Sequence, residues 1–272
     1  MEKGATGKLS TLARLDMELL TSSNIGALER LRFLLAKYYA VAADRREIRY
    51  LGRTFHYDGR LAPIPLQMYP KLVHFLSSKI NMKKVRTVLD IGANVGQFSF
   101  TLKALYPHTG VYCFEPNKTA FRILEDNMSG FRGTRLFNYG IGRPGRRRFY
   151  SSPSSSGLGS FYKKRVHQFG HKGDVEESTV NCIGLDHRSR SGLGIPGKAD
   201  LIKIDVEGAE TEVLRHLKGM SCRYLLVECN GNDRAGRIVD EIRRAFRADP
   251  VLLGTKALHK GSASMDCLFR LE

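Results

Sequence analysis

From residue 85 onward, short apolar runs alternate with stretches in which apolar residues recur at helical spacing. The predicted strands are residues 87–91, 110–114, 135–139, 200–206, 224–228, 251–253 and 266–271, and the predicted helices are residues 96–106, 119–127, 209–217 and 237–246. Strands that alternate with helices indicate a mostly parallel sheet covered on both faces. A turn containing Gly261 joins the last two strands, so we expect this seven-stranded α/β sheet to end in an antiparallel hairpin.

The first part of the chain lacks this alternation. Residues 1–43 are predicted to be helical, because apolar side chains recur there at helical spacing, namely Leu28, Leu31, Leu35 and Tyr38. Asn24 is a predicted N-terminal cap of this helix.

A connector then leads to the α/β part. Residues 50–70 contain several glycines and prolines, which predict irregular structure, and a further helix is expected over residues 71–80. We therefore divide the chain into an N-terminal helical extension with its connector, residues 1–80, and an α/β domain, residues 81–272.

A glycine-containing turn follows the first strand of the α/β domain. The strand ends in Asp90, and Gly92, Asn94 and Gly96 lie in the turn before the next helix. Glycine allows the backbone to approach a ligand where a Cβ atom would clash, and a helix N-terminus offers unbonded N–H groups. The turn lacks the full G-x-G-x-x-G pattern of dinucleotide binders. S-adenosylmethionine (SAM) has no pyrophosphate, so the looser turn and its preceding acid fit SAM better.

A second acid ends the next predicted strand. Glu115 lies 19 residues beyond Gly96 and is followed by Pro116 and Asn117. An acid about 20 residues beyond a glycine turn can accept hydrogen bonds from both hydroxyls of a ribose. We therefore predict that Glu115 and Asn117 belong to the cofactor site.

Two later strands also end in acids. Lys203 and Asp205 share one face of a strand, Glu207 follows, and Glu228 ends the next strand. The carboxyl ends of parallel strands meet at one edge, where ligands of α/β proteins bind. A buried charge is costly unless it is paired, so Lys203 is predicted to be buried and paired with Asp90 or Glu228. Structural ion pairing is the alternative role for these residues, and the two roles are compatible.

These four segments together resemble the FkbM family of SAM-dependent methyltransferases. The resemblance rests on VLDIGANVGQFS, FEPNKTAFRILEDN, LIKIDVEGAETEVL and YLLVECN, in the same order and spacing across residues 88–230. It implies a class I methyltransferase fold, which is Rossmann-like, and methyl transfer to oxygen, often on a sugar or other small-molecule hydroxyl. By position, the turn from Asp90 to Gly96 would hold SAM, Glu115 its ribose, and Asp205 and Glu207 would border the reacting methyl group.

The leading functional hypothesis is therefore O-methylation. The attacking hydroxyl must lose its proton, and the candidate bases are Asp205, Glu207 and Glu228. One alternative is a ribose 2′-O-methyltransferase acting on RNA, although the strand that ends in Glu228 lacks the lysine that such enzymes typically have beyond it. The other alternative is a SAM-fold module that binds an anionic partner without catalysis.

Charge and composition narrow the partners further. The formal net charge is +17, which favours anionic partners such as nucleic acid, phosphorylated substrates or anionic lipid headgroups. The five cysteines include no C-x-x-C pair, so neither a disulfide framework nor a metal site is expected. The N-terminus lacks the apolar core of a secretory signal, and no apolar run is long enough to span a membrane. We therefore expect a cytoplasmic protein, with peripheral membrane contact left open.

The segment between residues 140 and 180 is rich in glycine, serine and basic residues. No acidic residue occurs between Asp126 and Asp174, whereas ten basic ones do: Arg132, Arg135, Arg143, Arg146, Arg147, Arg148, Lys163, Lys164, Arg165 and Lys172. Such composition favours a mobile loop. We predict that part of it is a lid on which Arg146, Arg147 and Arg148 bind an anionic acceptor. A solvated basic loop, or an attachment point for membrane or RNA, is the alternative.

Overall fold

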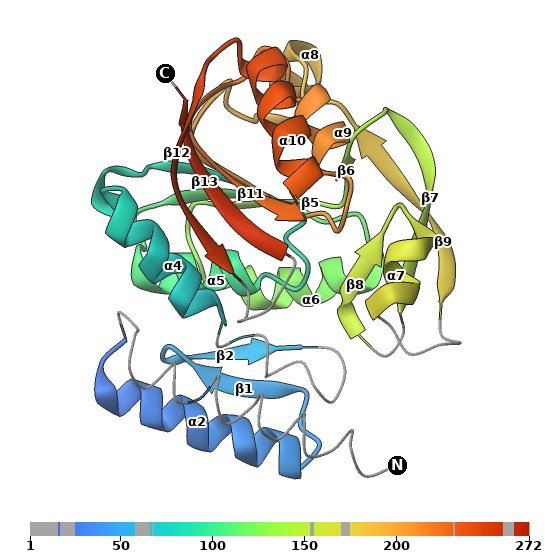
Figure 1. The fold of residues 1–272 in the computed structure, drawn as a ribbon. Coiled ribbons are helices and arrows are strands. Elements are labelled where there is room, and N and C mark those ends of the chain that lie inside the picture. Colours follow the sequence, from blue (N-terminus) through green and yellow to red (C-terminus); the bar gives the residue numbers. More distant parts are fainter. Residues whose placement is uncertain are drawn as a thin grey trace.

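A computed structural model describes residues 16, 25–57, 66, 68–152, 155–169, 175–230, 232–257 and 264–271 (Figure 1). The predicted cap Asn24 lies outside these residues. None of the helices within these ranges is long and apolar enough to cross a membrane.

The centre of the protein is a seven-stranded, mostly parallel sheet. Its spatial order is β12 (Pro250–Ala257), β13 (Ser264–Leu271), β11 (Ser221–Asn230), β10 (Lys198–Ile204), β3 (Thr87–Ile91), β4 (Gly110–Phe114) and β5 (Thr134–Phe137). The five strands from β11 to β5 are parallel, whereas β13 is antiparallel to both of its neighbours. The predicted sheet and its terminal antiparallel hairpin are confirmed.

Helices cover both faces of this sheet (Figure 1). One face carries α4 (Met68–Lys79), α5 (Gln97–Leu105) and α6 (Lys118–Met128), and the other carries α8 (His187–Leu193), α9 (Glu210–Arg215) and α10 (Asn232–Phe246). Successive strand residues alternate between two buried clusters, so that Val88 belongs to one cluster and Leu89 to the other. Burial on both faces explains why these strands are nearly continuous apolar runs in the sequence.

The N-terminal part forms more regular structure than predicted. After α2 (Ala27–Ala42), β1 (Glu47–Tyr50) and β2 (Arg53–His56) pair in an antiparallel hairpin where an irregular connector was expected to begin. The turn residues Leu51 and Gly52 both have positive φ angles, 47° and 77°, as a two-residue hairpin turn requires.

The apolar stripe that predicted α2 does not face the core. Its members Leu28, Leu31, Leu35 and Tyr38 are exposed, whereas Phe33 and Leu34 are buried. Gly26 occupies the N-cap position of α2, and no side chain among the described residues caps this end of the helix.

The β1–β2 hairpin shares a hydrophobic core with the α/β domain. Tyr50 and Phe55 pack on Phe100 of α5, with ring centroids 5.8 and 5.1 Å apart, and the Tyr50 hydroxyl lies 2.9 Å from Thr101 Oγ1. Asn127 of α6 bonds both backbone groups of His56. The β1–β2 hairpin is thus packed against α5 and α6 of the α/β domain.

The basic segment, residues 140–180, contributes the strands of a second sheet. The prediction of a mobile loop is therefore wrong for most of this segment. Its strands are β6 (Gly140–Ile141), β7 (Gly145–Ser152), β8 (Ser155–Ser160) and β9 (Glu176–Ile183), in the order β6-β9-β7-β8, and α7 (Lys163–Phe169) follows β8. Phe149, Val180 and Cys182 form a small buried cluster against Phe161. Serine, glycine and charged residues occupy many of the other strand positions, so the composition resembles that of a loop.

Candidate functional site

The turn after β3 is held by backbone hydrogen bonds. The N–H groups of Gly92 and Ala93 both donate to the carbonyl oxygen of Phe114 at 3.0 Å, and the Asp205 N–H donates to the Ile91 carbonyl at 3.1 Å. These bonds join the ends of β3, β4 and β10 at the carboxyl edge, where the predicted site residues were expected to meet.

The two glycines of this turn are required by the protein itself. Gly92 and Gly96 have φ angles of 82° and 92°. A Cβ atom on Gly92 would lie 1.9 Å from the carbonyl oxygen of Asp205, and one on Gly96 would lie 2.8 Å from Leu124 Cδ1. Close approach to a ligand was the predicted reason for these glycines, but close packing against the loop after β10 and against α6 is sufficient.

Glu115 connects the turn to the next strand. It is 6% exposed, and its two carboxylate oxygens accept the N–H groups of Asn94 at 2.9 Å and Asn117 at 2.8 Å. Burial raises the pKa of Glu115 to about 7, although these two N–H groups oppose the shift. The Asn117 side chain caps α6 by accepting the Thr119 N–H at 2.9 Å. The predicted cofactor residues Asn94, Glu115 and Asn117 are therefore adjacent.

A buried ion-pair network lies beneath the turn. Lys203 is 2% exposed, and its Nζ lies 3.2 Å from Asp90 Oδ1 and 3.3 Å from Asp205 Oδ2. Burial alone would lower the pKa of Lys203, but Asp205 and Asp90 together raise it above its usual value. The predicted pairing with Asp90 is confirmed, and Asp205 takes the place predicted for Glu228.

Asp90 is the most enclosed of the predicted site residues. It is fully buried, and its second oxygen accepts the Ser99 hydroxyl at 2.6 Å. Both Asp90 oxygens thus have partners inside the protein. Asp90 therefore holds Ser99 of α5 and Lys203 of β10 in place next to the turn.

An arginine from the second sheet's helix reaches the acids of the carboxyl edge. Arg165 Nη2 lies 3.4 Å from Glu207 Oε2 and 3.9 Å from Glu228 Oε2. Burial, followed by the charges of Asp205 and Glu228, raises the pKa of Glu207 to about 8, and Arg165 opposes this shift. Ser160 at the end of β8 also donates to the Glu207 carbonyl at 2.9 Å. The basic segment is thus fixed to the site by Ser160 and Arg165.

The three arginines singled out from the sequence lie elsewhere on the second sheet. Arg147 pairs with Glu212 of α9 and lies 4.6 Å from the ring centroid of Phe161. Arg148 is exposed and lies 3.6 Å from Glu177, and Arg146 is exposed as well. Their role in binding an acceptor stays a prediction. Arg165 was only one of the ten basic residues between Asp126 and Asp174, and no local pattern distinguished it.

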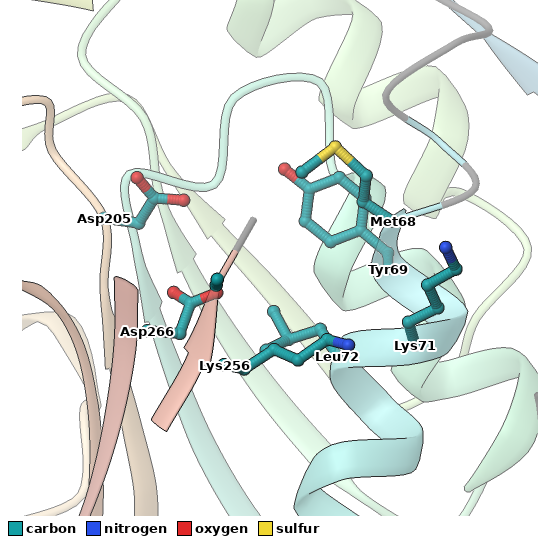
Figure 2. Close-up of a pocket in the computed structure, with 8 residues that line it drawn as sticks. Met68, Tyr69, Lys71, Leu72, Asp205, Lys256 and Asp266 are labelled. Atoms are coloured by element: carbon teal, nitrogen blue, oxygen red, sulfur yellow. The ribbon is translucent and has the colours of Figure 1, made fainter. Parts of the chain in front are cut away.

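A pocket opens beside Asp205, between α4 and the β12–β13 hairpin (Figure 2). Its lining consists of Met68, Tyr69, Lys71, Leu72, Asp205, Lys256, Ala257 and Asp266. Burial and the charge of Asp205 raise the pKa of Asp266 to about 7. Sequence reasoning selected only Asp205 from this set. The signal available for Asp266 was an acid near the start of a largely apolar strand.

Known proteins with similar sequences include methyltransferases. The sequence model of the family described as "Methyltransferase FkbM domain" matches residues 90–248. "Hexuronic acid methyltransferase AglP" of Haloferax volcanii is 32% identical over 51% of this chain and 54% of its own length. "2-O-methyltransferase NoeI" of Sinorhizobium fredii is 30% identical over 47% of this chain and 55% of its own. The chain thus spans about half the length of these curated relatives.

Among solved structures, Aeropyrum pernix fibrillarin in complex with natively bound S-adenosyl-L-methionine aligns with 84% of this chain and 82% of its own. The TM-score is 0.47 and the sequence identity is 13%.

Proposed function

The chain belongs to the FkbM family of methyltransferases, and on this premise we propose that it transfers a methyl group from SAM to a hydroxyl oxygen of a sugar or another small acceptor. The single observation that carries the proposal is the placement of Glu115 against the glycine turn, at the same carboxyl edge of the sheet as Asp205. The printed names of the two relatives, a hexuronic acid methyltransferase and a 2-O-methyltransferase, support a sugar-type acceptor.

The residues at the carboxyl edge suit SAM in charge and in hydrogen bonding. Each Glu115 oxygen accepts one backbone N–H, so each keeps a lone pair with which to accept a ribose hydroxyl. Asp205 and Glu228 place carboxylates at this edge, which favours the positively charged sulfonium of SAM. When bound, SAM supplies an activated methyl group. The Gly92–Gly96 turn and Glu115 would hold it.

The acceptor hydroxyl must lose a proton as it attacks. The candidate bases remain Asp205, Glu207 and Glu228. They lie in two different surroundings. Asp205 lines the pocket, whereas Glu207 and Glu228 lie near Arg165. Arg165 would hold these two carboxylates in place, or would bind an anionic group of the acceptor in exchange for them.

Replacing Glu115 with alanine is expected to weaken SAM binding about tenfold or more, because a charge-assisted contact to the ribose is lost. In the wild type, affinity should rise as the pH increases from 6 to 8. The pKa of Glu115 is raised to about 7, and ribose hydroxyls bind the ionised carboxylate, so binding releases a proton. Titration calorimetry across this pH range measures both effects, and the pH dependence should flatten in the variant.

The matched control is Glu125→Ala, which removes an exposed acid from α6. It should leave both the affinity and its pH dependence unchanged. A folded Glu115→Ala protein that binds SAM as tightly as the wild type does would contradict the assignment.

The acceptor class is tested by transfer from methyl-labelled SAM to glycans, nucleotide sugars and RNA. We expect label on the glycan-type acceptors, as an alkali-stable ether. Alkali-labile label would indicate a methyl ester, and label on RNA alone would support the ribose alternative. A protein that does not bind SAM would instead support the binding-module alternative.

A further inference from the structure

The pocket beside Asp205 is built mainly from residues outside the family match. Met68, Tyr69 and Leu72 come from α4, before residue 90, and Lys256 and Asp266 come from the terminal hairpin, after residue 248. Asp205 alone links the pocket to the glycine turn, because its carbonyl oxygen fills the space beside Gly92. The pocket therefore adjoins the proposed SAM site and shares Asp205 with it, whereas its other lining residues are separate.

Asp266 is a buried carboxylate of the pocket wall, and the charge of Lys256 on the neighbouring strand acts on it. It is 5% exposed, and within the described residues it makes neither a hydrogen bond nor an ion pair. Its register partners on the two neighbouring strands are Glu228 and Lys256. The Asp266 oxygens are not among the fully enclosed, unpartnered atoms of the described residues, so they are accessible from the pocket, where a ligand can supply the donor.

Tyr69 lies on the opposite side of the pocket (Figure 2). Burial, followed by the charge of Asp205, raises the pKa of its hydroxyl, which therefore stays protonated. Within the described residues this hydroxyl also lacks a hydrogen-bond partner. The pocket thus offers a hydrogen-bond acceptor on Asp266 and a hydrogen-bond donor on Tyr69. The apolar side chains of Met68 and Leu72 also line it.

We propose that this pocket binds the methyl acceptor, as a polyhydroxylated ring of the sugar type. Asp266 accepts a hydrogen bond from a ring hydroxyl, Tyr69 donates one to a ring oxygen, and Leu72 packs against the apolar C–H face of the ring. This inference rests on the proposed function. It assigns acceptor recognition to α4 and the terminal hairpin, and leaves SAM binding to the turn and Glu115.

The test is a calorimetric titration of methyl glucoside and methyl glucuronide into the full-length protein, with and without SAM. The wild type should bind at least one of them. Asp266→Asn and Tyr69→Phe should each weaken that binding about tenfold and change SAM affinity less than twofold. The matched controls Asp240→Asn and Tyr162→Phe alter exposed residues and should leave sugar binding unchanged.

Folding does not confound this test, since Asp266→Asn removes a charge that burial disfavours and should not lower the melting temperature at pH 8. Tyr69→Phe provides a second variant that keeps the ring. Sugar binding that survives both substitutions overturns the proposal. So does a wild type that binds neither glycoside at about 50 mM, a concentration that detects even millimolar affinity. Sugar binding without SAM binding would instead uphold the pocket and refute the proposed methyl transfer.

Discussion

Replacing Lys203 with methionine is expected to lower the free energy of unfolding by about 3–5 kcal/mol, because removing one partner of a buried pair leaves an uncompensated charge. In this variant, Asp90 and Asp205 both lose the ammonium group of Lys203. Asp90 is fully buried, and Asp205 is partly exposed, so Asp90 carries most of the penalty. Methionine matches the length of the lysine stem and can keep the packing against Phe98. Chemical denaturation measures the loss.

Two comparisons separate charge from packing in this experiment. Lys198→Met removes an exposed lysine from the same strand and should change stability by less than about 0.5 kcal/mol. Adding Asp90→Asn to Lys203→Met should recover part of the loss, since the amide needs no cation. A loss below about 1 kcal/mol in the single variant, or strictly additive effects in the double variant, would show that the network does not stabilise the fold.

Gly92→Ala is expected to cost about 2–5 kcal/mol, the sum of left-handed backbone strain and overpacking. The new Cβ atom would lie 1.9 Å from the Asp205 carbonyl oxygen, a backbone atom that cannot move without shifting the end of β10. Because the same movement would displace the proposed SAM turn, SAM affinity should fall together with the melting temperature.

Gly52→Ala is the control for this variant. Gly52 has a φ angle of 77°, close to the 82° of Gly92, but a Cβ atom there would meet no atom within 4 Å. It should therefore show the backbone strain alone, about 1–2 kcal/mol, with SAM affinity intact. Equal losses in the two variants would mean that the contact between Gly92 and Asp205 is not what requires glycine.

The second sheet changes the role expected for the basic segment. A mobile lid would leave the acids at the carboxyl edge open until an acceptor arrived. Instead, Ser160 and Arg165 already contact Glu207, and Arg147 is tied to α9. The described part of the segment therefore forms a wall beside these acids, in which Arg165 lowers the cost of holding Glu207 and Glu228 close together.

The sequence by itself determined the α/β sheet and the part of the site that follows from strand order. Strands buried on both faces must be apolar runs, so a charged residue at the end of such a run is conspicuous. Asp90, Glu115, Asp205 and Glu228 were found in this way. Parallel strands bring their carboxyl ends to one edge without any knowledge of side-chain packing, which is why these residues could be grouped in advance.

Only the tertiary structure decided the partners of these residues and the pocket beside them. Asp266 lies near the start of β13, and it reaches the carboxyl edge because β13 runs antiparallel between β12 and β11. Tyr69 and Arg165 arrive from segments whose local sequence resembles a connector and a loop. Their positions depend on contacts between residues far apart in the chain, and such contacts leave no periodic pattern in the sequence.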